Sequence, residues 1–455
     1  MNRAAAGPAT TSAADASPSF NRRATTLLLP ASLNLGITHV LAPALNGLMA
    51  RSVEPEAAIG GYAIAMGVMG LVALPQMRIQ QLTLVFLDDQ GSLSRLRRFV
   101  ALFALLSGLV AAIVAFTPML DLLLDRVFAT TGTLRAESAA ALVALAPFPI
   151  LAIVRTHLYG VALRIGRPRL VWIGTGAGAV AVVAVAALVL WLDPSAGAAI
   201  AAIAVSAGAG VETLVLVVGT TGPLRRDLAP SDGPLPTYGA LLRFFGPLLV
   251  AAFLPAVTQP LINAILTRAP EPEASVAAVS LTFGVNQIFL IALWGVQPTL
   301  LALMARGESP AAARRYANIV GLITVGPAAV VAFIPPLTSL VVHDLQGATG
   351  RLQEMTEAGL RILALLPPIL VQEAIFTSAI LRVRRAHLLV YVNAIRLVGL
   401  VAILLIGVNA TDLSGGVIGV TAIGGALVIE AIATVAFGLG AQRQLERRWQ
   451  PQTSL

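Results

Sequence analysis

Long apolar stretches recur along the whole chain, and short segments rich in arginine, proline and glycine separate them. Each stretch holds about 20 residues or more, which is enough for an α-helix to cross ~30 Å of hydrocarbon. The pattern predicts twelve transmembrane helices, over residues 25–50, 57–87, 97–119, 137–163, 170–192, 196–221, 238–267, 274–304, 314–342, 354–381, 387–409 and 414–441.

Polar segments lie at both ends of the chain and in its middle. Residues 1–24 are rich in Ala, Ser, Thr and Pro, a composition typical of disorder. A polar linker at 222–237 separates the first six predicted helices from the last six, and a tail follows at 442–455. The two sets of helices are predicted to form lobes at 25–221 and 238–441.

The composition agrees with an all-α polytopic membrane protein. Hydrophobic residues make up 57% of the chain and charged residues 11%, whereas a soluble globular protein carries roughly 25% charged residues. The chain contains no cysteine, so disulfides and thiolate metal sites are excluded.

The arginines predict how the helices are oriented. All 30 basic residues are arginine; 20 lie in the two termini and the loops after even-numbered helices, and five lie in the alternate loops. Because arginine-rich loops stay on the cytoplasmic side, both termini are predicted to be cytoplasmic, in a multi-pass protein of the inner membrane. The net charge of +8 then faces anionic lipid headgroups, and nucleic acid is not expected as a partner.

An internal repeat relates the two halves. The stretch "RSVEPEAAIG" from Arg51 reads almost like "RAPEPEASVA" from Arg268, 217 positions later. The same offset pairs Pro30 with Pro247, Pro43 with Pro260, Asn46 with Asn263 and Gly67 with Gly284, and an offset of 218 pairs Glu212 with Glu430. The chain is therefore predicted to be a duplicated six-helix unit.

Six is an even number, so both copies are inserted the same way up. Their axis of symmetry then runs along the membrane normal, as in transporters built from parallel repeats. Two such lobes face each other across a cleft, and rocking of one lobe against the other would open the cleft to each side in turn. This architecture favours a transporter over a channel.

Pro43 and Pro260 lie inside the first predicted helix of each lobe. A proline there removes one helical hydrogen bond and leaves a carbonyl free, and Asn46 and Asn263 follow about one turn later. A bend beside polar groups suits a hinge next to a ligand cavity. We therefore predict that the prolines act as hinges and the asparagines contact the ligand, although inheritance through the duplication also explains their recurrence.

Ionisable residues inside the predicted spans carry the main functional signal. An arginine near the bilayer centre costs at least ~2.5–3.5 kcal/mol, so such residues usually face a cavity or a partner. The predicted ligand-binding residues are Asn46, Arg78, Arg155, His157, Asn263, Arg361 and Arg396, and the predicted coupling or proton-carrying residues are Glu212, Glu373 and Glu430.

Some of these residues have alternative roles. Glu212 and Glu430 are equivalent in the two lobes, and they also suit structural partners of Arg396 and other groups within each lobe. Arg155 and Glu373 are equivalent at offset 218 but opposite in charge. Arg155 could bind an anion while a desolvated Glu373 carries a proton, or the two could form an ion pair between the lobes that closes the cleft.

The predicted spans hold more guanidinium groups than carboxylates, and planar guanidinium binds carboxylate and phosphate oxygens two at a time. A small multivalent anion is therefore the predicted cargo, with H⁺ or Na⁺ as the coupling ion. The sequence has no phosphate-binding loop of the ATPase type, and the histidines lack metal-ligand spacing. No enzyme activity, cofactor or metal site is predicted.

At these residues the chain resembles the progressive ankylosis protein family, within the superfamily of multidrug, oligosaccharidyl-lipid and polysaccharide exporters. The resemblance is carried by "LGITHVLAPALNGLMAR" (Leu35–Arg51), "RTHLYGVALR" (Arg155–Arg164), "PLLVAAFLPAVTQPLINAILTR" (Pro247–Arg268), "LRILALLP" (Leu360–Pro367) and "IRLVGLVAI" (Ile395–Ile403).

The resemblance implies a V-shaped bundle of twelve helices in two lobes, alternating access, and export of multivalent anions such as citrate, nucleotides or pyrophosphate. It marks Asn46, His157, Asn263, Arg361, Arg396 and Glu430 as matching positions. The chain departs from the family in its first helix, which reads Leu41-Ala42-Pro43 where the family is acidic. It also has Gln259 where the family has arginine.

The sequence therefore predicts a secondary-active exporter of small anions. Three alternatives stay open. A flippase for a pyrophosphate-linked lipid would also need arginines, and would add a groove open to lipid. A cation-coupled multidrug exporter would have more carboxylates than arginines in its cavity, and a membrane scaffold would have all its interior arginines paired and no cleft.

Overall fold

The computed structural model describes residues 20–448, apart from Ala229, 231–234, 306–307, Arg384 and Ala386, and every regular element among them is a helix. The first half contains α1 (Phe20–Met49), α2 (Pro55–Val72), α3 (Gln76–Phe86), α4 (Gln90–Phe116), α5 (Met119–Asp121), the π-helix η1 (Leu122–Val127), α6 (Gly132–Ala144), α7 (Phe148–Arg164), α8 (Pro168–Leu192), the 3-10 helix η2 (Pro194–Ala196) and α9 (Ala198–Asp227). The second half contains α10 (Tyr238–Leu266), α11 (Pro272–Phe289), α12 (Ile291–Trp294), α13 (Val296–Ala305), α14 (Pro310–Phe333), α15 (Pro335–Ser339), the π-helix η3 (Leu340–Leu345), α16 (Gly350–Leu363), α17 (Pro367–Arg382), α18 (Leu388–Ala410) and α19 (Gly415–Arg448).

The twelve predicted spans correspond to these helices in order. In the described part of the chain, eight helices are long and apolar enough to cross a membrane, and three bent pairs raise the number to eleven. The 30-residue helix α1 takes the place of the first predicted span. The all-helical fold class is therefore the predicted one.

Five spans predicted as continuous are broken in the structure, so the sequence analysis was wrong on this point. The spans 57–87, 137–163, 274–304, 314–342 and 354–381 each divide into two or more helices. The bends are 45° between α6 and α7, 67° after α11, and 49° between α16 and α17. Proline accounts for three of the breaks, because Pro75, Pro147 and Pro367 stand at them and cannot donate a helical hydrogen bond.

Helices extend into all three segments that were predicted to be polar and non-helical. α1 begins at Phe20, so residues 20–24 are helical, and residues 1–19 of the predicted disordered segment lie outside the described residues. In the same way α9 continues to Asp227 within the predicted linker, of which Ala229 and residues 231–234 lie outside the described residues. α19 continues to Arg448 within the predicted tail, and residues 449–455 lie outside the description.

The internal repeat is visible in the helix boundaries. α11 begins and ends 217 residues after α2, and the π-helix η3 begins and ends 218 residues after η1. π-helices are rare, and they are most often found as single turns. Two of them at equivalent positions therefore show that the two six-helix units share details of backbone conformation as well as order.

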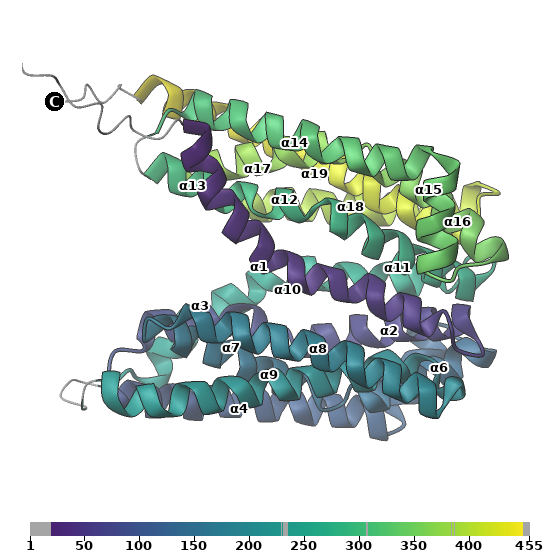
Figure 1. Ribbon diagram of the computed structural model, residues 1–455, viewed down its shortest axis with the longest axis horizontal. Helices are drawn as coiled ribbons and strands as arrows, with labels where there is room; N and C mark the ends of the chain where they lie inside the picture. Colours follow the sequence, from purple (N-terminus) through teal and green to yellow (C-terminus); the bar gives the residue numbers. More distant parts are fainter. Residues whose placement is uncertain are drawn as a thin grey trace, which may run out of the picture.

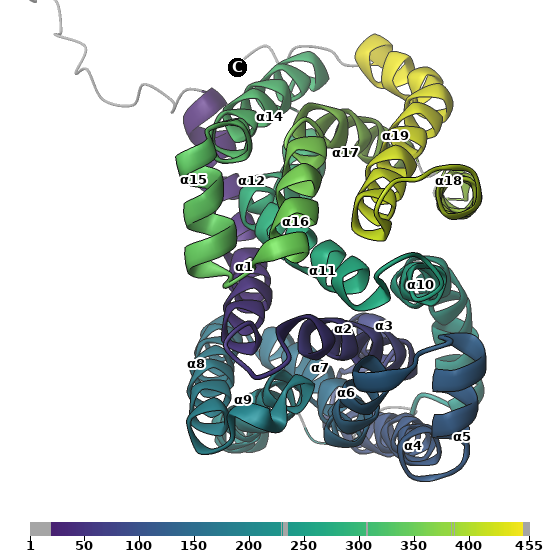
Figure 2. The ribbon, with the colours of Figure 1, turned by 90° about the vertical axis from the view of Figure 1, so that its right-hand side faces the viewer.

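Figure 1 shows two bundles, one made of α2–α9 and the other of α11–α19, with α1 passing between them. We call the end where α1 begins and α19 ends the terminal end, and the opposite end, where α2 and α11 begin, the distal end. Figure 2 views the molecule from the distal end. It shows α10, and α11 at the inner edge of the second bundle, lying beside α2 of the first bundle.

The bundles meet at the distal end. There α2 packs against α11, and the backbone N–H of Leu134 in α6 donates to Glu273 Oε1 of α11 over 3.1 Å. At the terminal end, α3 and α13 share at most isolated contacts in the described part of the chain. The two lobes are thus closed against each other distally and apart at the terminal end.

The first halves of α1 and α10 cross over to the opposite bundle. Ala24 and Leu28 of α1 are buried in a core with Leu293 and Val296 of the second half, and Arg23 pairs with Glu308 over 2.8 Å. The start of α10 does the reverse. Phe245 stacks edge-on against Phe99 and Phe103 of α4, with ring centroids 5.8 and 5.1 Å apart. Each lobe therefore completes its core with a half-helix from the other.

Glycine allows α3 and α7 to pack closely beside the candidate site. A Cβ atom built on Gly160 of α7 would lie 2.6 Å from Thr83 Cβ and 3.1 Å from the Gln80 carbonyl oxygen of α3. The same atom on Gly176 of α8 would meet nothing within 4 Å. The absence of a side chain at Gly160 therefore allows α7 to lie directly against Thr83 and Gln80 of α3.

We expect Gly160→Ala to lower the free energy of unfolding by about 1–3 kcal/mol, because overpacking forces the two helices apart. Gly176→Ala is the matched control, and it should leave stability unchanged or raise it by up to about 1 kcal/mol through helix propensity. Thermal unfolding in detergent measures both. Equal melting temperatures for the two variants would contradict the close packing of α3 on α7.

Candidate functional site

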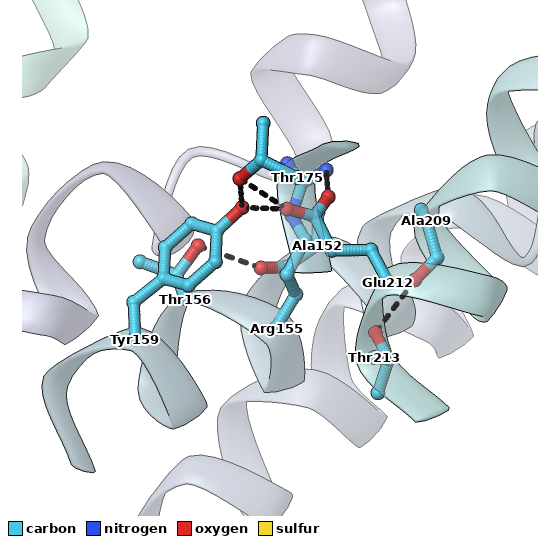
Figure 3. Close-up of polar contacts among 8 residues, drawn as sticks. All are labelled: Ala152, Arg155, Thr156, Tyr159, Thr175, Ala209, Glu212 and Thr213. Carbon is cyan, nitrogen blue, oxygen red and sulfur yellow. Dashed lines mark hydrogen bonds and ion pairs between the residues drawn. The ribbon is translucent and has the colours of Figure 1, made fainter. Parts of the chain in front are cut away.

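A cluster of polar side chains lies inside the first lobe, between α7, α8 and α9 (Figure 3). Arg155 Nη1 is 2.9 Å from Glu212 Oε2. The other carboxylate oxygen of Glu212 accepts hydrogen bonds from Thr175 Oγ1, over 2.8 Å, and from the Tyr159 hydroxyl. The Arg155 guanidinium also lies 6.0 Å from the centre of the Tyr159 ring. We call these four residues the first-lobe cluster.

This cluster neutralises its own charge. The Glu212 side chain is 5% exposed and that of Arg155 is 24% exposed. A carboxylate so deeply buried costs several kcal/mol in desolvation, which only a partner and further hydrogen bonds can offset. Arg155 supplies the countercharge, and the two hydroxyls supply the remaining hydrogen bonds.

The second lobe contains the equivalent cluster between α10, α17, α18 and α19. Arg396 Nη1 lies 3.4 Å from Glu430 Oε2, and Arg396 Nη2 donates to Thr258 Oγ1 over 3.4 Å. Glu373 accepts a hydrogen bond from Thr377 Oγ1 over 2.7 Å and lies within electrostatic range of both Arg396 and Glu430. We call these five residues the second-lobe cluster.

The two clusters obtain their arginine from different helices. An offset of 218 places Glu373 at the position of Arg155, and it places Arg396 at the position of Gly178. A Cβ atom built on Gly178 would lie 3.3 Å from Glu212 Oε2, so the glutamate fills the space that a side chain there would need. The cation thus comes from α7 in the first lobe and from α18 in the second.

This exchange leaves the two clusters with different charges. The first-lobe cluster has one arginine for one carboxylate, whereas the second-lobe cluster has one arginine for two carboxylates, Glu373 and Glu430. A single guanidinium can balance only one of them. The second lobe therefore has an acidic group in excess, which either holds a proton or attracts a cation.

Arg78 has no partner among the described residues. Its Nε atom is buried and makes no hydrogen bond, and α3 lies on the side of its bundle that faces the other lobe (Figure 1). Helical spacing places Arg78 on the same face of α3 as Gln81 and Val85, which are both exposed. Arg78 is therefore the predicted ligand-binding residue whose charge is left unbalanced.

Arg361 and His157 have local partners. Arg361 Nη2 lies 3.4 Å from Glu357 Oε2 of the same helix, and its side chain is 46% exposed. His157 is buried, and its Nδ1 lies 2.9 Å from Thr83 Oγ1, whose hydroxyl donates to the Ile79 carbonyl. The hydroxyl can then only accept from the ring, so His157 Nδ1–H fastens α7 to α3.

Asn46 and Asn263 are buried at the contact between the lobes, with 2% and 0% of their surface exposed. Each donates a hydrogen bond to a backbone carbonyl of the opposite lobe. Pro43 and Pro260 lie inside α1 and α10, which continue through them as helices. The helix breaks in the described part of the chain lie elsewhere, in the five divided spans.

The predicted surplus of unpaired arginines is smaller than the sequence suggested. Arg155, Arg361 and Arg396 each have a glutamate partner in their own lobe. In addition, Arg155 pairs with Glu212 and forms no ion pair with Glu373. The assignment of Glu212 and Glu430 as structural partners within each lobe agrees with these contacts.

The sequence analysis missed the four hydroxyl residues of the clusters, Tyr159, Thr175, Thr258 and Thr377, and also Gly178 beside the first-lobe cluster. Tyr159 and Thr175 are uncharged, and nothing in their spacing shows that both reach Glu212. Gly178 could have been found, because the repeat offset applied to Arg396 leads directly to it. Its lack of a side chain was the signal that the two lobes build their ion pairs differently.

Comparison with solved structures identifies the fold. Over 90% of this chain and 96% of the other, the protein resembles the inward-facing conformation of a multidrug resistance MATE family transporter of the MOP superfamily, with a TM-score of 0.69 and 15% identity. The outward-facing conformation of such a transporter gives a TM-score of 0.60 and 14% identity over 94% of this chain and 97% of the other.

A third structure of this fold is a MOP superfamily transporter from Pyrococcus furiosus, whose binding pocket is described as having reverse polarity. It gives a TM-score of 0.61 at 15% identity, over 94% of this chain and 96% of the other. No protein-family model and no curated protein sequence matches the chain. The chain thus has the fold of MOP superfamily transporters, which agrees with the superfamily of the sequence resemblance, whereas the progressive ankylosis family stays a prediction.

The ion pair of the first-lobe cluster predicts strong coupling between its members. Arg155→Met or Glu212→Gln alone should lower the free energy of unfolding by about 3 kcal/mol, because each leaves a buried group without its partner. The double variant should lose less than the sum of the two. Glu357→Gln, which breaks the exposed Arg361 pair, is the control and should cost only about 0.3–0.5 kcal/mol. Additive losses in a thermal unfolding cycle would contradict the pairing.

Proposed function

We propose that the protein is a secondary-active exporter that works by alternating access and carries small anions out of the cell in exchange for protons. The proposed moving bodies are the two lobes, residues 25–221 and 238–441, in the inner membrane, with the first halves of α1 and α10 moving with the opposite bundles that bury them. The arginine distribution favours a cytoplasmic terminal end. A structure closed distally and open at the terminal end is then inward-facing.

The unequal charge of the two lobes is the observation that carries the proposal. The second-lobe cluster has one carboxylate more than it has arginines, and the first lobe has Arg78 without a partner. A titratable acid in one lobe and a free guanidinium in the other are what an exchange of protons for anions requires. The divergence of a duplicated site suits two different tasks better than a purely structural role.

Glu373 is the group that we propose for the proton. Arg396 is already 3.4 Å from Glu430 and can balance only one negative charge. Protonation of Glu373 would remove the remaining charge from a site that is largely out of water. Binding or release of this proton at Glu373 changes the charge of the second lobe. It therefore also changes the electrostatic free energy of bringing the second lobe against the first.

Arg78 is the group that we propose for the cargo. It lies on α3, on the side of the first lobe that faces the second, and the lobes are apart at this end. A guanidinium there can bind a carboxylate or phosphate group through two hydrogen bonds. The Pyrococcus furiosus transporter with a pocket of reverse polarity supports the idea that the pocket charge varies within this fold.

A cation-coupled multidrug exporter is the second candidate. It is favoured by the acidic excess of the second-lobe cluster and by the structural likeness to transporters described as multidrug resistance proteins. In that case the second lobe would bind the coupling cation and Arg78 would play no part in cargo binding. The two candidates differ in the charge of the transported molecule.

Flux into proteoliposomes should distinguish them. With a pH gradient imposed, we expect transport of citrate, a nucleotide or pyrophosphate, and no transport of a cationic dye. Arg78→Ala should reduce anion flux by about tenfold or more, because it removes charge-assisted hydrogen bonds of which each one alone is worth about that factor, while Gln81→Ala on the same helix face should not. Glu373→Gln should leave binding of the anion intact but remove the response to the pH gradient. Dye transport that survives Arg78→Ala would favour the multidrug exporter.

A disulfide across the distal contact tests alternating access itself. A Cβ atom built on Gly60 of α2 would lie 3.7 Å from Val276 Cβ of α11, a separation that suits a disulfide. The natural chain contains no cysteine, so the two introduced residues can pair only with each other. We expect oxidised Gly60→Cys/Val276→Cys to stop transport and reduction to restore it.

The matched control for this disulfide is Gly407→Cys/Ile418→Cys, which joins α18 to α19 inside one lobe. A Cβ atom on Gly407 would lie 3.4 Å from Ile418 Cβ. This bond should form equally well without stopping transport. Full transport with the lobes linked at residues 60 and 276 would show that they need not separate.

A further inference from the structure

The two buried asparagines make reciprocal hydrogen bonds between the lobes. Asn263 Nδ2 donates to the carbonyl of Ala63 over 2.9 Å, and Asn46 Nδ2 donates to the carbonyl of Ser280 over 3.4 Å. The repeat offset of 217 relates both the donors and the acceptors. The last turn of α10 is thus bound to α2, and the last turn of α1 is bound to α11.

A glycine lies one turn after each of these carbonyls. In an α-helix the carbonyl of residue 63 already bonds to the N–H of Gly67, and that of residue 280 to the N–H of Gly284. A second donor can approach only if no side chain covers the oxygen. A Cβ atom on Gly67 would lie 3.6 Å from Asn263 Nδ2, and one on Gly284 would lie 3.3 Å from Asn46 Nδ2. Glycine at 284 therefore leaves Asn46 the room to reach α11, whereas a methyl group at residue 67 would meet Asn263 at an ordinary van der Waals distance.

The two bonds are unequal. Asn263 Oδ1 accepts a hydrogen bond from Gln259 Nε2 over 3.1 Å, which orients the amide towards Ala63. The equivalent of Gln259 in the first lobe is Ala42, which has no amide to offer. The Asn46 bond is correspondingly 0.5 Å longer, from the two lengths of 3.4 and 2.9 Å. The hydrogen bond of Asn263 is therefore the stronger of these two contacts between the lobes.

We propose that Asn46 and Asn263 form a latch that holds the distal end of the lobes closed and releases on every transport cycle. This inference rests on the proposed alternating access. Both amides are buried where α2 meets α11, so separation of the lobes at this end must break both bonds and expose the amides to water. The asparagines then act as positioning residues that set the balance between the two conformations, and they do not bind cargo in the inward-facing state.

The latch can be tested without measuring transport. Val276 is 1% exposed at the distal contact, so a cysteine at this position in the otherwise cysteine-free chain reacts with a maleimide only while the lobes are apart. In full-length protein in nanodiscs, Asn263→Ala should speed labelling of Val276→Cys by about 2- to 10-fold, the range for one hydrogen bond. Asn46→Ala should speed it less.

Two controls separate the latch from general loosening. Ile418→Cys is 2% exposed inside the second lobe, and its labelling should not change in either asparagine variant. Gly284→Ala should speed labelling of Val276→Cys because its methyl group displaces the Asn46 amide, whereas Gly67→Ala, with contacts of 3.5 Å or more, should have a smaller effect. This glycine pair keeps the latch testable if an alanine variant at an asparagine does not fold.

Unchanged labelling of Val276→Cys in Asn263→Ala and in Gly284→Ala would overturn the latch. Faster labelling of Ile418→Cys to the same degree would also overturn it, because the effect would then be loss of packing. A failure of the proposed function gives a different result. If the Gly60→Cys/Val276→Cys disulfide did not affect transport, alternating access would fail whatever the labelling rates are.

Discussion

A charge buried among apolar helices must find its countercharge within reach of its own side chain, and this requirement organises the interior of the molecule. Glu212 is balanced by Arg155, and Glu430 by Arg396. Both pairs lie inside a lobe, so the lobes can move relative to each other without separating them. Charges that joined the lobes would cost several kcal/mol to pull apart in a low-dielectric setting. Two of the contacts that join the lobes are neutral amides on carbonyls, which are cheaper to break than a buried ion pair.

The duplication supplied one scaffold, and substitution at a few positions then gave the lobes different chemistry. The arginine stands on α7 in the first lobe and on α18 in the second, where Arg396 is the equivalent of Gly178. On α17, Glu373 occupies the position equivalent to Arg155. The backbone of the two lobes stays alike despite this difference in side chains. α2 and α11 have the same length and are offset by the repeat distance, and the same is true of η1 and η3.

The fold could be predicted from the sequence because apolar length and arginine placement are properties of single segments. The twelve spans, their order and the repeat follow from them. The breaks at Pro75, Pro147 and Pro367 were missed because a proline in a membrane helix can also be accommodated without a break, as Pro43 and Pro260 are. Glu430 was already considered as a partner of Arg396, but the partner of Arg155 depends on which helices become neighbours, and no segment contains that information. Applying the repeat offset to every charged residue, Arg396 included, would have come closest.

The exchanged half-helices have a consequence for how the protein is made. Ala24 and Leu28 leave the ribosome early, yet the surface that buries them is formed by α12 and α13, some 270 residues later, the distance from Ala24 to Leu293 being 269. Until that segment has been made, the start of α1 lacks the residues that bury it in the complete fold. The first lobe likewise lacks Phe245 in its aromatic core until synthesis has passed the midpoint of the chain. Neither lobe is therefore an independent folding unit, and the native core closes only after both have entered the membrane.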